Sequence, residues 1–433
     1  MFVTAVETKG SESVTDHLPY DVGIDLGSKK HQACLMNRSG KVLAEVAFAH
    51  SASGMNDFLR VIEKMTGQPA GRVGVASETP RGPVMECVLE RGYAVFSIHP
   101  KQLDRFRDRH SVAGAKDDRR DAFVLADSMR TDLVLFRSLK TESAAILRLR
   151  ELSRLEDDLI QEHNRLINQL REQWHRYFPQ LLERSSAAED PFLGDLLEMA
   201  PKPEMAAKLT CRRMERVLHR HRIRRLTADQ VAAALRTPAL ELVAGSADAA
   251  SQQALLLLPR LRLLKQQRTA IAARLEALLD ELMPAPAEAD KGAADRPTDV
   301  AILRSLPGVG RVLAATLLAE ASQAIADRDD GALRSYSGVA PVTRQSGNRK
   351  VVVMRRGCNN RLRHALSHWS RVSTVCDDRS RSYSRRLRER GHSQGTAWRA
   401  VADRWLNGFM ARLRAQQRFD PPRWNRSVEN RID

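Results

Sequence analysis

Four carboxylates in the first third of the chain have residue types and spacing that suit metal chemistry. Asp25 and Glu78 each end an apolar run typical of a buried strand, whereas Asp118 and Asp121 lie three residues apart on one face of a predicted helix. Converging carboxylates repel one another unless a cation lies between them. Because Mg²⁺ prefers oxygen ligands, the pattern predicts a magnesium site, with Mn²⁺ as the alternative ion.

A simpler explanation exists for the two helical acids alone. Asp118 and Asp121 stand in the first turn of the predicted helix, where negative charge interacts favourably with the helix dipole. That explanation does not cover Asp25 and Glu78, which end strands. Asp117 adds a further carboxylate, and we expect its side chain to point away from the other four.

The charge of the chain indicates a polyanionic partner. Its 433 residues carry a formal net charge of +17, and residues 344–390 hold fourteen Arg or Lys against three acids. Residues 202–225 form a second basic cluster, with nine Arg or Lys against two acids. Solvated helix faces are the alternative explanation, but nucleic acid is the first candidate partner. No apolar run approaches the roughly 18 residues of a membrane helix, so we expect no membrane partner. We expect the protein to be located in the cytoplasm of a prokaryote.

The elements that must position the acids follow a recognisable order. After a flexible N-terminus at 1–19, the pattern βββαβαβα predicts an α/β RNase H-like domain over 20–137. A basic connection is expected over 101–109. The predicted strands are 20–26, 31–36, 41–48, 72–77 and 93–98, and the predicted helices include 55–65 and 117–130.

The rest of the chain is predicted to be helical. Leucines at heptad spacing in 143–176 and 257–282 predict a coiled-coil middle region within 138–283, which packs either as a hairpin within one chain or between subunits. A Pro- and Ala-rich linker at 284–298 leads to a mainly α C-terminal domain at 299–415. A polar tail is expected at 416–433.

Two C-terminal motifs have residue types that bind phosphate. The turn 306–310 contains Gly308 and Gly310 before an apolar helix, so its free N–H groups suit a DNA phosphate, although a plain tight turn explains it equally well. Ser346 lies in a loop rich in arginine. Its hydroxyl is either a hydrogen-bond donor to phosphate or a nucleophile on phosphorus, which needs a base or a metal to act. The candidate nucleic-acid contacts are Lys116, Arg119, Arg120, Gly308, Gly310, Arg344, Arg349, Lys350, Arg355 and Arg356.

Five motifs in this order resemble the DEDD transposases of the IS110 insertion-sequence family. They are Gly-Ile-Asp-Leu-Gly, Glu78-Thr79, Ala-Lys-x-Asp-x-x-Asp-Ala, Leu-Pro-Gly-Val-Gly and Gly-x-Ala-Pro-x-x-x-Gln-Ser-Gly, and they extend from about residue 20 to about residue 375. The resemblance implies a RuvC-like domain whose Asp25, Glu78, Asp118 and Asp121 bind magnesium, and a C-terminal transposase domain whose Ser346 is the nucleophile.

The same resemblance implies what the protein does and with which partners. A site-specific recombinase would join donor and target DNA through a covalent phosphoserine link, guided by a non-coding bridge RNA, in a homo-oligomer from dimer to tetramer. Two other hypotheses remain: a RuvC-like nuclease that uses water in place of Ser346, and a nucleic-acid-binding protein whose site has decayed. The intact acids argue against the last.

Overall fold

The computed structural model describes residues 18–79, 81–110, 117–183, 190–238, 242–243, 245–283, 296–347 and 349–420. The chain forms two compact units, Met1–Glu142 and Ser143–Asp433. Within the described ranges, no helix combines the length and the apolar character needed to cross a membrane. The predicted linker 284–298 lies outside these ranges except for its last three residues, as do all but the last two residues of the N-terminal segment 1–19 and the tail from residue 421.

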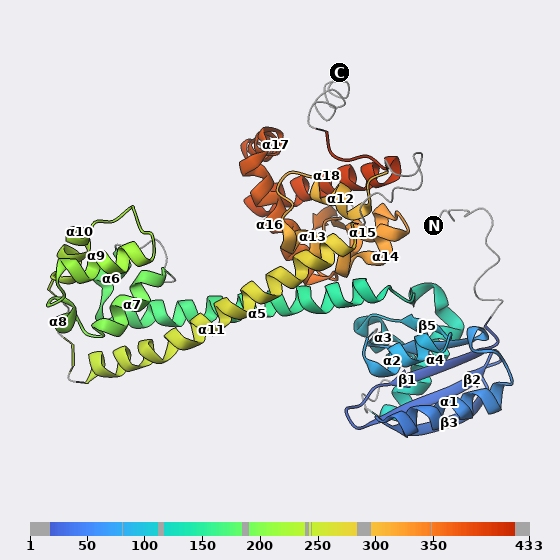
Figure 1. Ribbon diagram of the computed structural model, residues 1–433. Helices are drawn as coiled ribbons and strands as arrows, with labels where there is room; N and C mark the ends of the chain where they lie inside the picture. Colours follow the sequence, from blue (N-terminus) through green and yellow to red (C-terminus); the bar gives the residue numbers. More distant parts are fainter. Residues whose placement is uncertain are drawn as a thin grey trace, which may run out of the picture. The chain divides into compact units, whose positions relative to one another are not determined.

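The first unit is a mixed α/β domain with one six-stranded sheet in the order β3-β2-β1-β4-β5-β6 (Figure 1). Strands β1, β4 and β5 are parallel, and the other pairings are antiparallel. The elements are β1 (Tyr20–Asp25), β2 (Lys30–Asn37), β3 (Val42–Ala49), α1 (Ala52–Thr66), β4 (Val73–Ser77), α2 (Pro83–Glu90), β5 (Ala94–Ser97), α3 (Pro100–His110), α4 (Asp118–Asp132) and β6 (Arg137–Leu139).

Alternation along β1 directs its residues to two different helical layers. Val22 and Ile24 are fully buried against α1, where they pack with residues such as Phe58 and Leu59. Gly23 faces the opposite side, and a Cβ built there would lie 2.0 Å from the carbonyl oxygen of Ala122 in α4. Only glycine therefore allows α4 to approach the strand this closely.

Among its described residues, the second unit is helical apart from one two-stranded ribbon. Its elements are α5 (Ala144–Tyr177), α6 (Pro179–Glu183), α7 (Pro191–Met199), α8 (Pro203–Ala206), α9 (Cys211–Arg220), α10 (Ala228–Leu235), α11 (Ser246–Glu281), α12 (Asp299–Arg304), α13 (Arg311–Glu320), α14 (Ser322–Ala326), α15 (Asp330–Tyr336), β7 (Val342–Ser346), β8 (Arg349–Val353), α16 (Asn360–Cys376), α17 (Asp378–Glu389) and α18 (Gln394–Ala415).

The two long helices α5 and α11 pack side by side in opposite directions within the chain (Figure 1). The heptad-spaced leucines of 143–176 and 257–282 form two seams, and they are buried in two clusters or packed against them. One cluster is shared with the C-terminal helices and one with α6–α10. Arg268, which interrupts the second seam, places Nη1 3.2 Å from Nδ1 of buried His163 on α5. The intrachain alternative is therefore the one observed, and a coiled-coil geometry stays a prediction.

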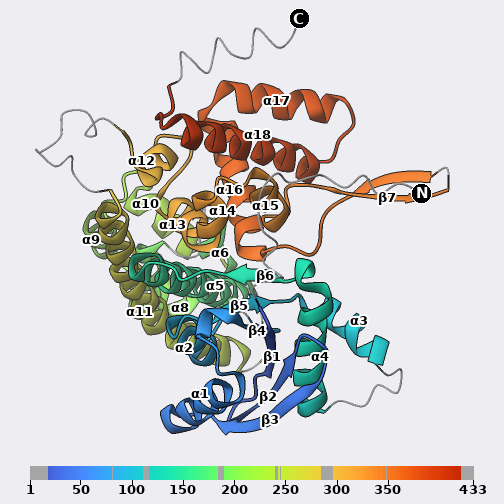
Figure 2. The same ribbon diagram turned by 90° about the vertical axis from the view of Figure 1, so that its right-hand side faces the viewer.

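The structure differs from the expectations in three places. The basic connection at 101–109 is the helix α3, because Leu103 is buried and anchors one face of an otherwise charged segment. Strand β6 was not predicted, and it adds three residues to the sheet beside β5. The arginine-rich loop around Ser346 is the ribbon β7–β8, which Figure 2 shows extending from the helical unit.

Candidate functional site

Two of the four carboxylates lie at the same edge of the sheet. Asp25 is the last residue of β1, and Glu78 directly follows β4. The two strands are parallel, with Ile24 opposite Ser77, so their carboxyl ends coincide. This register places both acids next to each other on neighbouring strands, at the end of a parallel pair where ligand sites commonly form.

The other two carboxylates come from the first turn of α4. Asp117 precedes this turn and caps the helix by accepting a hydrogen bond from the backbone N–H of Arg119. Asp121 is only 2% exposed, although Asp118 is exposed. The pKa of Asp25 is raised by burial and then by the negative charges of Asp121, Asp118 and Glu78, so the four carboxylates act on one another electrostatically.

A guanidinium from α3 lies among these acids. Arg107 donates from Nε to Asp121 Oδ1 at 2.7 Å and from Nη2 to Asp121 Oδ2 at 3.0 Å. The same Nη2 lies 3.4 Å from Glu78 Oε2, and Nη1 donates to Asp104 at 2.6 Å. Sequence reasoning missed this residue. The only signal was the arginine spacing in 101–109. That spacing does not identify Glu78, which lies twenty-nine residues earlier and directly follows β4, as a partner.

The residue types of the four carboxylates fit a divalent cation, because all four supply oxygen donors. Burial is the main cause of the raised pKa of Asp25, and the neighbouring acids add a repulsion that a cation would relieve. Their side-chain arrangement is that of an ion pair with Arg107. Within the described part of the chain, no group of three or more His, Cys, Asp or Glu side chains is arranged to hold a metal.

The basic residues predicted beside the acids fall into different environments. Arg119 forms an ion pair with Glu45 on β3, and Arg120 is half-buried. Lys116 lies outside the described residues. An arginine already paired with a carboxylate must give up that partner to bind phosphate, so Arg119 is a weaker candidate contact than its sequence position indicated.

Ser346 lies in the second unit, at the end of β7. It pairs across the ribbon with Arg349, and its side chain is exposed. Gly347, which follows it, has φ 55° and open space where a Cβ would stand. This left-handed turn residue lets the ribbon reverse direction at its tip, directly beside the hydroxyl.

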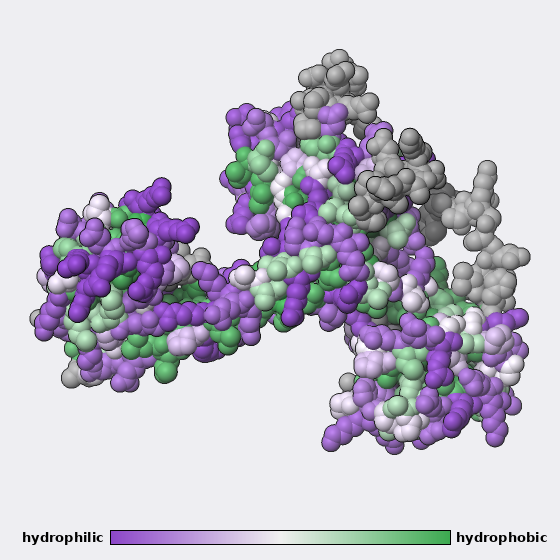
Figure 3. All heavy atoms as spheres, in the orientation of Figure 1, coloured by the Kyte–Doolittle hydropathy of each residue, from purple (hydrophilic) through white to green (hydrophobic). Residues whose placement is uncertain are grey.

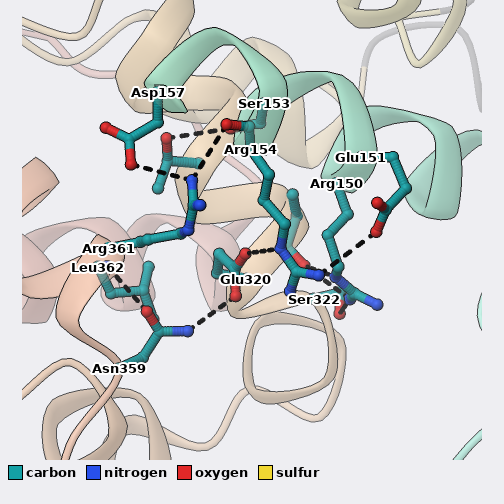
Figure 4. Close-up of polar contacts among 12 residues, drawn as sticks. Arg150, Glu151, Ser153, Arg154, Asp157, Glu320, Ser322, Asn359, Arg361 and Leu362 are labelled. Atoms are coloured by element: carbon teal, nitrogen blue, oxygen red, sulfur yellow. Dashed lines mark hydrogen bonds and ion pairs between the residues drawn. The ribbon is translucent and has the colours of Figure 1, made fainter. Parts of the chain in front are cut away.

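A polar network holds the base of the ribbon (Figure 4). Asn359, which follows the ribbon, donates through Nδ2 to buried Glu320 at 2.7 Å. The same nitrogen donates to the Tyr336 hydroxyl at 3.0 Å. The backbone N–H of Asn359 donates to the Tyr336 carbonyl at 2.7 Å. Glu320 also accepts from Nε of Arg154 on α5 at 2.7 Å. The chain segments that enter and leave the ribbon are thus joined to each other and to two long-range partners.

The turn 306–310 separates α12 from α13, and its two glycines differ. Gly308 has φ 77°, and a Cβ there would stand 3.2 Å from Val372 Cγ1 on α16. Trp369 Nε1 donates to the carbonyl of Pro307 at 2.8 Å. This side of the turn therefore packs against α16, whereas Gly310 caps α13 with open space around it. Both glycines stay predicted phosphate contacts, and Gly310 is the more exposed of the two.

The five other predicted cations lie on the ribbon or just after it. Arg355 donates through Nε to the carbonyl of Ala340 at 3.2 Å and so braces the ribbon. Arg356 is exposed, and its carbonyl accepts from Arg363. Arg344, Arg349 and Lys350 are exposed on the ribbon itself.

Comparisons with known proteins give two matching family models. Residues 22–179 match a transposase family model of the DEDD, IS110 type, and residues 300–385 match the model described as transposase IS116/IS110/IS902 family. The first match contains all four carboxylates, and the second contains Ser346.

Individual relatives cover most or half of the chain. A mini-circle putative transposase for IS117 from Streptomyces coelicolor is 31% identical over 94% of this chain and 97% of its own length. A putative transposase from Sinorhizobium fredii is 42% identical over 50% of this chain, a match that spans 61% of that relative. An uncharacterized protein of insertion element IS116 from Streptomyces clavuligerus is 28% identical over 92% of this chain. The four carboxylates and Ser346 each lie within a matched family model, and the IS117 relative matches nearly the whole chain. The chain belongs to the IS110 family of transposases.

Proposed function

We propose that this transposase cuts and joins DNA strands through a covalent phosphoserine intermediate at Ser346, with Asp25, Glu78, Asp118 and Asp121 as the ligands of Mg²⁺. The observation that supports the proposal is the parallel register of β1 and β4, which puts Asp25 and Glu78 at adjacent strand ends, together with Arg107, which joins Glu78 to Asp121 of α4. When bound, the cation would supply Lewis-acid polarisation of a phosphoryl oxygen.

The proposed reaction exchanges one phosphodiester for another. Ser346 Oγ attacks the scissile phosphorus, the Oγ–P bond forms, and the P–O bond to the leaving deoxyribose oxygen breaks. The hydroxyl proton passes to a base, and the leaving oxygen takes up one proton. Because the number of phosphodiester bonds is conserved, a later attack by a DNA hydroxyl on the phosphoserine can join new strands without an external energy source.

A suicide DNA substrate tests this chemistry. We expect the wild-type protein to form a covalent protein–DNA adduct on a denaturing gel, and Ser346→Ala to form none. Thr343→Ala is the matched control, because Thr343 carries a hydroxyl on the same strand and pairs with Val352. Asp25→Asn should also abolish the adduct. Cleavage by Ser346→Ala, with no adduct from any variant, would favour the alternative nuclease in which water is the nucleophile.

The proposal includes the partners implied by family resemblance. These are donor and target DNA, a structured bridge RNA, and further copies of this chain. Sequencing of RNA that copurifies with the protein examines the RNA component separately from the serine chemistry.

A further inference from the structure

The pairing register of the ribbon divides its cations between two faces. Residues opposite each other in an antiparallel pair point to the same face, and the face alternates along each strand. Ser346 pairs with Arg349, and Arg344 precedes Ser346 by two residues, so these three side chains share a face. Lys350 pairs with Gln345 and belongs to the other face. The sequence alone placed all of these cations near Ser346 without distinguishing them.

Arg344 and Arg349, on the same face of the ribbon as Ser346, have no visible structural role. Among the described residues, neither Arg344 nor Arg349 forms a hydrogen bond or ion pair with another side chain, and residues 342–353 contain no Asp or Glu. Other arginines of this unit are engaged: Arg334 forms a two-pronged ion pair with Asp403, and Arg361 pairs with Asp157 and Asp158. The guanidiniums beside Ser346 are therefore available to an external anion.

We propose that Arg349, supported by Arg344, binds a non-bridging oxygen of the phosphate that Ser346 attacks. Cross-strand neighbours have Cβ atoms about 4.5–5.5 Å apart, so the long Arg349 side chain can reach an oxygen of a phosphorus held at the serine hydroxyl. A guanidinium presents several donors in a planar fork that matches phosphate oxygens. The inference rests on the proposed function of Ser346 and assigns the residue that neutralises the reacting phosphate.

The chemical role follows from where charge develops. As Oγ–P forms and the bond to the leaving oxygen breaks, negative charge increases on the non-bridging oxygens. A fixed cation that contacts those oxygens stabilises this arrangement more than the ground state, which speeds the step. Lys350, on the opposite face, would contact DNA without contacting the reacting phosphate.

The test compares Arg349→Gln with Lys350→Gln, which removes one equal charge from the neighbouring position. At saturating DNA we expect Arg349→Gln to slow adduct formation on the suicide substrate by about 10²- to 10³-fold, whereas Lys350→Gln should lose rate mainly at sub-saturating DNA, through weaker binding. Both variants should weaken DNA binding by a similar small factor. Arg349→Lys should recover part of the rate, since it restores charge without the fork. Circular dichroism checks that each variant folds.

A second substrate separates contact with the phosphate from an effect on ribbon structure. When a methylphosphonate replaces the scissile phosphate, one non-bridging charge is lost, so the rate ratio between wild type and Arg349→Gln should shrink towards one. An unchanged ratio, or equal losses in Arg349→Gln and Lys350→Gln, would overturn the role of Arg349 while wild-type adduct still supports Ser346. Absence of adduct from the wild type would instead overturn the proposed function, and this inference with it.

Discussion

Arg107 joins two of the four carboxylates, Glu78 and Asp121, through its guanidinium. Its guanidinium contacts both oxygens of Asp121 and one of Glu78, while its positive charge lowers the pKa of Asp25 against the larger raising effect of burial. Asp121 is almost completely buried, and Arg107 is the guanidinium that contacts both of its carboxylate oxygens. A metal that binds the same oxygens must take over the role of Arg107.

Replacing Arg107 with glutamine should expose this competition. In EDTA we expect the variant to unfold about 2–4 kcal/mol more easily, because a buried carboxylate loses its partner. Added Mg²⁺ should raise the Tm of the variant more than that of the wild type, since the freed oxygens bind the ion and ligand binding stabilises the folded state. Thermal scans with and without Mg²⁺ measure both effects. Arg105→Gln, an exposed neighbour on α3, is the control; equal Mg²⁺ responses in all three proteins would contradict the competition.

The sequence patterns predicted the position of Asp25 at a strand end but did not predict the position of Arg107 beside it. Asp25 and Glu78 follow apolar runs, so the strands and the position of each acid at a strand end were predicted. Arg107 sits among charged residues in a helix whose single buried side chain is Leu103, and such a segment has little periodic signal. Its partners are determined by the packing of α3 against the sheet and α4, which local sequence does not encode.

The close packing of helix α4 on strand β1 brings Asp121 to the end of the strand where Asp25 lies. The two elements approach so closely at Gly23 that a Cβ would lie 2.0 Å from the Ala122 carbonyl oxygen and 2.5 Å from the Ala126 nitrogen. Both are backbone atoms, so no side-chain rotation can relieve the overlap. The helix as a whole would have to move away from the strand.

Gly23→Ala should therefore destabilise the protein by at least about 2 kcal/mol and weaken the site without altering any acid. Chemical denaturation measures the stability loss, and adduct formation under folding conditions measures the site. Gly71→Ala is the control, because the nearest atom to its added Cβ is the Gly92 carbonyl oxygen at 3.7 Å. A Gly23→Ala protein as stable as Gly71→Ala would show that α4 does not depend on this contact.

Elements with a buried face were predicted and those without one were not. The predicted strands at 20–26, 31–36 and 72–77 differ from β1, β2 and β4 by one residue or two at their ends, because apolar residues face helical layers. The ribbon β7–β8 is exposed along nearly its whole length, so its sequence has no inward-facing alternation to detect. Its base is set by Glu320 and Asn359, which are far from each other in sequence.

The distribution of charge over the whole molecule differs from its distribution along the sequence. The basic cluster 202–225 is compensated in part by acids from other elements: Arg220 pairs with Asp195, Arg225 with Asp190, and Lys202 with Asp248. Hydrophilic side chains cover most of the visible face of these helices in Figure 3. The ribbon cations have no such partners among the described residues. Net charge therefore overstates the phosphate contacts of the 202–225 cluster relative to those of the ribbon.

Two triple variants of equal charge should separate these surfaces by the salt dependence of DNA binding. Each phosphate contact on duplex DNA adds about 0.9 to the slope of log K against log salt. Removing Arg344, Arg349 and Lys350 as glutamines should reduce the slope by about 2–3, whereas removing Lys202, Arg220 and Arg225 should reduce it by less than about 1. Fluorescence anisotropy over a salt series gives both slopes. A larger reduction from the second triple would place the main DNA contact on the 202–225 cluster, because ion-paired arginines would then be exchanging their carboxylate partners for phosphate.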